Sequence, residues 1–149
     1  MKFVADKMLG RLARWLRIMG QDAAYGPHLS GRGLLRAARR EGRVILTRDQ
    51  SIRRMNPPEY LMIESDRFRE QLKQVVRQYH LDPLENAFTR CVECNTPFEL
   101  MTKESVREKV PPYVFSTQDR FSFCRKCQRI YWPATHQQKM LEELKALDF

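Results

Sequence analysis

The four cysteines of the chain form two C-x-x-C pairs, Cys91 with Cys94 and Cys124 with Cys127, and 29 residues separate the pairs. Each pair presents two thiolates from one tight turn, and two such turns complete the tetrahedral shell that zinc prefers. Because all four ligands are sulfur, no position is left open for water, which indicates a structural rather than a catalytic ion. Redox chemistry at one C-x-x-C pair is the alternative, and the presence of a second pair fits it poorly.

Asp6 and Asp49 are the carboxylates placed best for metal-dependent hydrolysis. Asp6 follows the segment 2–5 and Asp49 follows the segment 44–47, and we predict that both segments are strands. Phosphodiester hydrolysis with Mg²⁺ or Mn²⁺ requires carboxylates that converge on one point. An aspartate after a strand is also a common helix N-cap, so capping is the alternative for both residues, and the two roles can coexist.

Basic residues are concentrated in the first third of the chain. Residues 1–54 hold 13 Lys and Arg against four acids, a balance of 13 − 4 = +9 that equals the net charge of the whole chain. Eleven of these 13 cations are arginine, which binds phosphate through a two-pronged fork. The distribution favours a polyanionic partner, most commonly nucleic acid, over an ordinary solvated surface.

The hydrophobic periodicity places helices between the strands. Residues 7–19 have the period of a helix, with Met8 and Trp15 on its apolar face. The cations of this segment fall on a different face: Lys7, Arg11, Arg14 and Arg17. A second helix, capped by Ser30, runs to about residue 41 and carries its own basic stripe: Arg32, Arg36, Arg39 and Arg40. We predict further strands at residues 23–25 and 60–63, and a third helix at 67–79 that Asp66 caps.

Strands that alternate with helices indicate an α/β fold with a mainly parallel sheet and helices on both faces. The working edge of such a sheet is the carboxyl end of its strands, where we expect Asp6 and Asp49. Beyond Leu81-Asp82-Pro83 the periodicity fades until a final amphipathic helix at 135–147. We therefore predict an α/β domain at residues 1–88, and a zinc ribbon with a C-terminal helix at 89–149.

No apolar run is long enough to cross a membrane, and the N-terminus lacks the pattern of a signal peptide. We expect a cytoplasmic location, in which reduced thiols favour metal over disulfides.

Several motifs together resemble the PIN-like RNase family that is named for the C-terminal region of the Mut-seven exonuclease. They are Phe3-Val4-Ala5-Asp6 with residues 8–17, Thr47-Arg48-Asp49, Gln71-Leu72, the two C-x-x-C pairs, Val110-Pro111, and Tyr131-Trp132-Pro133 with Thr135-His136. The resemblance covers nearly the whole chain. It implies a PIN-like three-layer fold with a zinc ribbon, and Asp6 and Asp49 match the presumed metal-binding acids of the family.

The chain departs from the family pattern at one point. Family members usually carry an acid near the start of the second helix, whereas Leu29-Ser30-Gly31-Arg32-Gly33 has none. Asp22, Glu64 or Asp66 are the residues that we consider as substitutes for this ligand.

The function that we expect is a Mg²⁺- or Mn²⁺-dependent RNase with Asp6 and Asp49 as catalytic metal ligands. Phosphate contacts are expected from Arg11, Arg14 and Arg17, and Arg48 is expected to touch phosphate or to pair with an acid. The alternative is an RNA-binding module that has lost catalysis and keeps the basic face and the zinc ribbon. A protein-interaction adaptor is a third possibility.

Overall fold

A computed structural model describes residues 1–149. Its first sheet has four strands: β1 (Lys2–Ala5), β2 (Asp22–Ala24), β3 (Val44–Thr47) and β4 (Tyr60–Met62). All neighbours are parallel, and the order is β2-β1-β3-β4, which places the first strand beside the third. The α/β class and the parallel sheet that the sequence predicts are therefore confirmed.

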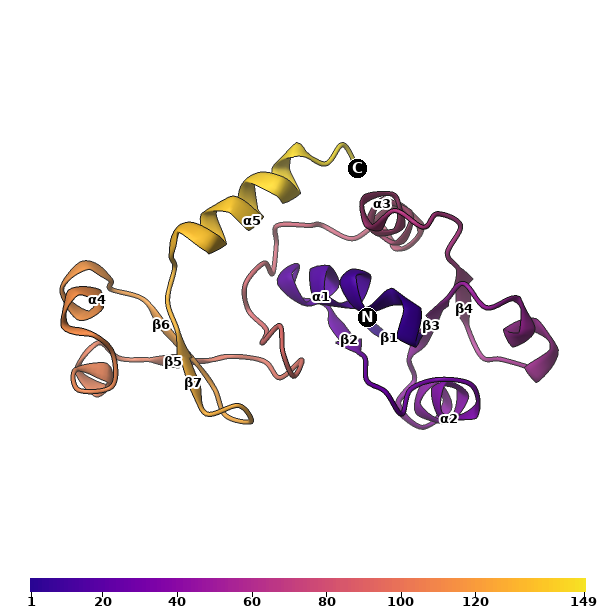
Figure 1. Cartoon of the computed structure of the whole chain (residues 1–149), viewed down its shortest axis with the longest axis horizontal. Helices are drawn as coiled ribbons and strands as arrows, with labels where there is room; N and C mark the ends of the chain where they lie inside the picture. Colours follow the sequence, from indigo (N-terminus) through magenta and orange to yellow (C-terminus); the bar gives the residue numbers. More distant parts are fainter. The chain divides into compact units, whose positions relative to one another are not determined.

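Helices cover both faces of this sheet (Figure 1). They are α1 (Gly10–Ile18), α2 (Arg32–Glu41) and α3 (Phe68–Tyr79). Because side chains alternate along a strand, Phe3 and Val4 of β1 face opposite ways. The Phe3 ring packs against Tyr79 of α3 with 5.4 Å between centroids, whereas Val4 joins the core cluster under α2. Helices α1 and α3 thus lie on one face and α2 lies on the other.

The first predicted helix is divided in two. A 3₁₀ turn, η1 (Lys7–Leu9), comes before α1, and the Asp6 carboxylate caps it by accepting a hydrogen bond from the Lys7 amide. The expected cap at Asp6 is confirmed, but the 3₁₀ turn rotates Met8 out of the apolar stripe and leaves it 60% exposed. After α1 the chain turns at Gly20, whose φ is +79°. A Cβ at this position would lie only 2.0 Å from the Asn86 carbonyl oxygen, so a side chain does not fit here.

Two predicted caps are wrong. The N-cap of α2 is Gly31 rather than Ser30, and it makes no side-chain hydrogen bond. The N-cap of α3 is Arg67, also without a side-chain cap, and Asp66 plays no part. Instead, the Ser65 hydroxyl accepts from the Arg67 amide at 3.0 Å. A second 3₁₀ segment, η2 (Gln50–Met55), follows β3 and begins at a true cap, Asp49.

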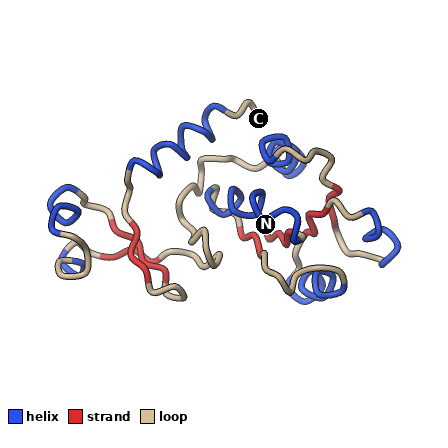
Figure 2. The backbone as a smooth tube through the Cα atoms, viewed as in Figure 1, coloured by secondary structure: helices blue, strands red, loops and turns tan.

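The C-terminal part holds a three-stranded antiparallel sheet, red in Figure 2, with the order β5-β6-β7. Its strands are β5 (Glu99–Met101), β6 (Phe121–Cys124) and β7 (Arg129–Tyr131). The helical segments are η3 (Glu104–Val106), α4 (Pro112–Thr117) and α5 (Thr135–Ala146). The core here is small, with Val106, Val110, Val114 and Phe121 as its buried members. Trp132 packs edge-on against Phe121, with 6.4 Å between centroids.

The chain forms two compact units, Met1–Asn95 together with Phe149, and Thr96–Asp148. The domain boundary between residues 88 and 89 stays a prediction. None of the helices combines the length and the apolar character that a membrane crossing requires.

Candidate active site and cysteine cluster

Asp6 and Asp49 line the same pocket, which has a volume of about 440 Å³. Asp6 directly follows β1, and its amide continues the ladder by donating to the Leu46 carbonyl of β3 at 2.9 Å. Asp49 follows β3 by two residues. Because β1 and β3 are parallel neighbours, their carboxyl ends bring the two acids to one edge of the sheet. The other lining residues are Lys7, Met8, Ser30, Gly31, Arg48 and Gln50.

Thr47 connects the two aspartates. Its hydroxyl donates to Asp6 Oδ2 at 2.8 Å and accepts from the backbone amide of Asp49 at 3.0 Å. The residue is completely buried, so no water competes for these bonds. Together with the Lys7 amide on Oδ1, at 2.6 Å, the Thr47 hydroxyl fixes both oxygens of the Asp6 carboxylate.

Asp49 is the more exposed of the two aspartates. Its carboxylate is exposed and accepts from the Ser51 amide at 2.9 Å. The hydrogen bonds from Ser51 hold the pKa of Asp49 below its usual value, and the charge of Lys7 acts in the same direction. The group is therefore ionised at neutral pH and adds an exposed negative charge to the pocket that the buried Asp6 also lines.

The donors of this pocket fit a hard divalent cation. Such ions take oxygen ligands, and each carboxylate oxygen has more than one lone-pair site, so the hydrogen bonds already present leave room for a metal. The set is nevertheless small. Residues 1–149 contain only one group of three or more acid, His or Cys side chains that can share an ion, and that group is the cysteine cluster.

The structure places none of the three considered substitute acids in the pocket. Asp22 is the first residue of β2 and lies opposite Lys2, the first residue of β1, in the strand register. It is therefore at the amino edge of the sheet, opposite to the edge with the pocket. Glu64 and Asp66 lie beyond β4 and do not line the pocket. In the stretch where the resemblance implies an acid, this chain has Ser30 and Gly31, and both residues line the pocket.

If the pocket binds a divalent cation, replacing Thr47 with valine should weaken that binding about 10- to 100-fold, as loss of support to a metal ligand does. Valine keeps the shape and removes the hydroxyl, so Asp6 loses one partner and the Asp49 amide loses another. The measurement is a titration of Mn²⁺ binding. Thr47→Ser, which keeps the hydroxyl, is the matched control, and an unchanged Mn²⁺ affinity in a folded Thr47→Val protein would contradict this role.

Of the four arginines predicted to contact RNA, the structure brings only Arg48 to the pocket. Its side chain is exposed and makes no ion pair with an acid, so of the two expected roles the pairing with a carboxylate is absent. Arg11 and Arg14 are exposed on α1. The Arg11 guanidinium lies 3.8 Å above the ring centre of Phe68, and Arg14 pairs with Glu93 at 3.3 Å.

Arg17 is placed differently from what a phosphate contact requires. It is only 6% exposed. Its guanidinium donates to the carbonyl oxygens of Ala23 at 2.9 Å, Val92 at 2.8 Å and Glu93 at 3.1 Å. Burial lowers the pKa of Arg17, and Cys94 and Cys91 oppose that shift. Arg17 therefore anchors the backbone of the first C-x-x-C turn to β2. Its guanidinium is not available to bind a phosphate.

The four cysteines form one cluster, in which all sulfur atoms lie within 4.8 Å of one another. The two turns are built alike. Asn95 donates to the Cys91 carbonyl at 2.9 Å, and Gln128 donates to the Cys124 carbonyl at 2.8 Å. Both residues have positive φ, +73° and +57° respectively. In the second turn the Cys127 amide also points at Cys124 Sγ, at 3.4 Å, a contact that suits a thiolate.

This cluster can hold a metal ion such as zinc. With Zn–S bonds of about 2.3 Å, a tetrahedron places its sulfur atoms roughly 3.8 Å apart, a spacing that lies within the 4.8 Å limit that all four sulfur atoms satisfy. Cys91 and Cys124 are fully buried, and Cys94 and Cys127 are partly exposed.

A polar network that the sequence did not suggest fixes the first turn to the sheet. The Asn95 amide group accepts from the Ala23 amide at 3.0 Å and donates to Asp22 at 2.6 Å. Asp22 also receives Arg43 at 2.7 Å. Burial raises the pKa of Asp22, but the hydrogen bonds from Arg43 and Asn95 outweigh it and leave the pKa below its usual value. Asp22 is thus a structural acid.

A comparison with known families matches residues 1–144 to the Mut7-C RNAse domain. Neither curated proteins nor solved structures gave a match. The family match spans the sheet with its two aspartates and all four cysteines, and it implies an RNase-type function with RNA as the substrate. The chain belongs to the family of Mut7-C RNAse domains.

Proposed function

We propose that this protein is a metal-dependent ribonuclease that hydrolyses RNA phosphodiester bonds in the pocket lined by Asp6 and Asp49. One observation carries the proposal. The two acids come from different strands, line the same pocket, and are joined through the buried hydroxyl of Thr47. A helix cap needs no such connection, so capping alone does not explain the arrangement.

In this proposal Asp6 and Asp49 hold a Mg²⁺ or Mn²⁺ ion, which activates water and stabilises the charge that develops on the phosphate when it is bound. Thr47 and the Lys7 amide keep the Asp6 carboxylate in one orientation, which limits the reorganisation that binding requires. Arg48 and Lys7 supply positive charge at the pocket and orient the phosphodiester. Asp49, ionised and exposed, completes the site on the solvent side.

We further propose that the cysteine cluster binds zinc as a structural ion. Four sulfur ligands leave no position for water or substrate, and the small core of residues 96–148 leaves much of the folding free energy to metal binding. Exposed Arg11 and Arg14 remain candidates for RNA contact. The cytoplasmic location stays a prediction.

The test is cleavage of a labelled single-stranded RNA by the zinc-loaded protein, with Mg²⁺ or Mn²⁺ either present or withheld. We expect cleavage with either cation and background rates without them. Withholding the cation is preferable to chelation, because a chelator also strips the cysteine cluster. Cleavage that is equally fast in the absence of both cations would contradict the proposed chemistry.

The number of carboxylates favours a second candidate function, an RNA-binding module with impaired catalysis. Only two acids line the pocket, and Ser30 and Gly31 stand where the family usually has a third. Fewer carboxylates bind Mg²⁺ less tightly, since ligand charge sets the affinity. RNA binding without cleavage at saturating Mn²⁺ is the result that this second function predicts.

A further inference from the structure

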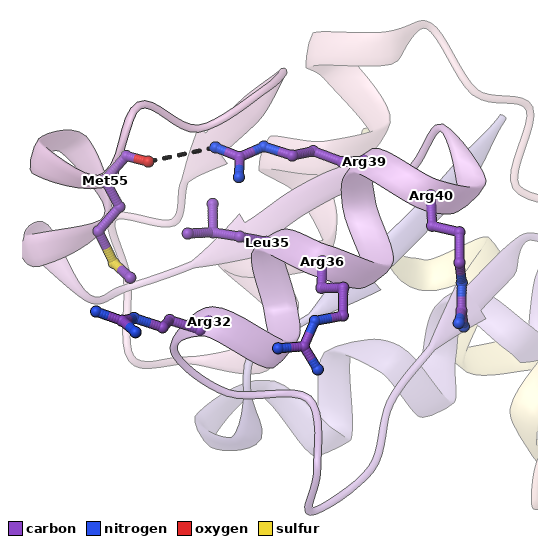
Figure 3. A pocket seen from close by; sticks show the side chains of 6 residues that line it. All are labelled: Arg32, Leu35, Arg36, Arg39, Arg40 and Met55. Carbon is purple, nitrogen blue, oxygen red and sulfur yellow. Dashed lines mark hydrogen bonds between the residues drawn. The ribbon is translucent and has the colours of Figure 1, made fainter.

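A second pocket on the surface is larger than the one with the aspartates. It has a volume of about 730 Å³ and is lined by Arg32, Leu35, Arg36, Arg39, Arg40 and Met55 (Figure 3). We call it the α2 groove. Four of its six lining residues are arginines and none is an acid, so its rim is positively charged.

The arginines repeat along the helix in a way that suits a chain of phosphates. Arg32, Arg36 and Arg40 follow one another at intervals of four residues, so each lies slightly more than one helical turn, roughly 6 Å, beyond the last. Figure 3 shows their side chains leaving the same helix, and all three residues are exposed. Phosphates along a nucleic-acid strand are also evenly spaced, so one strand can meet several guanidinium groups.

The charges of the groove are largely uncompensated. Arg32 and Arg36 are exposed and make no ion pair. Arg40 meets only the half-buried Glu41, at 3.5 Å, and Glu41 also pairs with Arg43. Arg39 is held in place by the carbonyl oxygens of Asn56, at 2.7 Å, and Met55, at 3.4 Å, which leave its positive charge unneutralised. Surface arginines often form ion pairs with neighbouring acids. Arg32, Arg36 and Arg39 have no such partner, so their charges remain available to an anion.

The floor of the groove is apolar and rigid. Leu35 is 5% exposed and belongs to the core cluster under α2, and Met55 packs against the same cluster. An apolar floor with a cationic rim suits a strand that carries both bases and phosphates.

The same two segments line the groove and the aspartate pocket. Ser30 and Gly31 line the pocket, and the next residue, Arg32, lines the groove. Likewise, η2 contributes Gln50 to the pocket and Met55 to the groove. The pocket and the groove are therefore neighbours along both segments, which would allow one strand to occupy both.

We propose that the α2 groove binds the sugar-phosphate backbone of single-stranded RNA outside the cleavage pocket, with Arg32 and Arg36 as the principal phosphate contacts. This inference rests on the proposed function for the identity of the polyanion. It assigns the strongest RNA-binding surface to α2, not to the α1 arginines that the sequence favoured.

The test is fluorescence anisotropy of a labelled oligouridylate, about 12 nucleotides long to exceed one binding site, with zinc-loaded protein and without Mg²⁺ or Mn²⁺. We expect Arg32→Gln/Arg36→Gln to weaken binding about tenfold at low salt and to flatten the slope of log K against log salt by about 1.4, the value for two lost contacts on a single strand. Arg32→Lys/Arg36→Lys should keep most of the slope. The single Arg36→Glu variant repeats the test with one surface substitution.

Arg67→Gln/Arg120→Gln removes the same charge from exposed residues that do not line the groove, and it should bind almost as the unchanged protein does. Equal losses in both double variants would overturn the proposal, because net charge alone would then explain the effect. So would a poly-glutamate peptide that displaces the RNA at equal concentration, since the groove would then suit an acidic protein.

Cleavage measured on the same proteins separates this inference from the proposed function. If Arg32→Gln/Arg36→Gln loses RNA affinity and no protein cleaves RNA in Mn²⁺, the groove stands and the nuclease proposal fails. If the unchanged protein cleaves RNA and the variant binds RNA equally well, the groove proposal fails and the nuclease proposal stands.

Discussion

RNA cleavage should fall by at least about 10³-fold when Asp6 is replaced by asparagine. The substitution keeps the size of the side chain and removes its charge. Losing an ionised ligand of a catalytic cation costs on the order of 4 kcal/mol of transition-state stabilisation, which corresponds to roughly 10³ in rate. The measurement is the initial rate on a labelled single-stranded RNA at saturating Mn²⁺. Asp49→Asn should act in the same direction.

The double variant Asp6→Asn/Asp49→Asn should be little worse than either single variant, because residues that act as one unit lose their effect together. Asp66→Asn is the matched control, since it removes an exposed carboxylate that lies outside the pocket. RNA binding in the absence of divalent cations should survive in all of these proteins. An Asp6→Asn protein that is folded and still cleaves RNA at the original rate would refute the assignment.

Removal of the metal from the cysteine cluster should unfold the three-stranded sheet β5-β6-β7. Structural zinc contributes about 10–16 kcal/mol in small zinc-binding domains at neutral pH, more than the few buried valines and Phe121 of this region can replace. Hydrogen exchange before and after chelation gives the answer amide by amide. We expect the amides of β6 to lose protection while those of β1 and β3, in the larger hydrophobic core, keep theirs.

Cys124→Ser tests the same point without a chelator and should abolish stoichiometric zinc binding. Ser122→Ala, on the same strand, is the control and should bind zinc normally. Co²⁺ in place of zinc should give the visible absorption of tetrahedral thiolate coordination. If metal-free protein keeps full protection in β6, the cluster is not what holds this sheet together.

The sequence was sufficient for the sheet and for the edge at which the aspartates lie. Strand β3 was predicted with its observed bounds, because a run of four apolar or β-branched residues, Val44–Thr47, strongly favours a strand. Asp6 and Asp49 reach the same pocket because parallel connections place successive carboxyl ends at one edge. That geometry is a property of the topology, so local sequence patterns can reveal it.

The roles of individual polar side chains depended on tertiary contacts that no local pattern reports. Arg17 belongs to the same basic helix as Arg11 and Arg14, yet it is buried against the carbonyls of a turn about 75 residues later in the chain. Thr47 was noticed only as part of a motif, because the hydrogen bond that its hydroxyl donates to Asp6 links two different strands. The stripe on α2 was visible as a pattern, but only the tertiary structure shows that Arg39 donates to backbone carbonyls of Met55 and Asn56 and not to an acid.

The central claim is that Asp6 and Asp49 hold one divalent cation between them. The most direct measurement is a crystal structure of the zinc-loaded protein soaked in Mn²⁺, with anomalous scattering used to locate manganese. We predict a manganese peak within coordinating distance of carboxylate oxygens from both aspartates, and its loss in Asp6→Asn crystals. A well-ordered pocket without manganese, in crystals grown at a concentration that supports RNA cleavage, would contradict the claim.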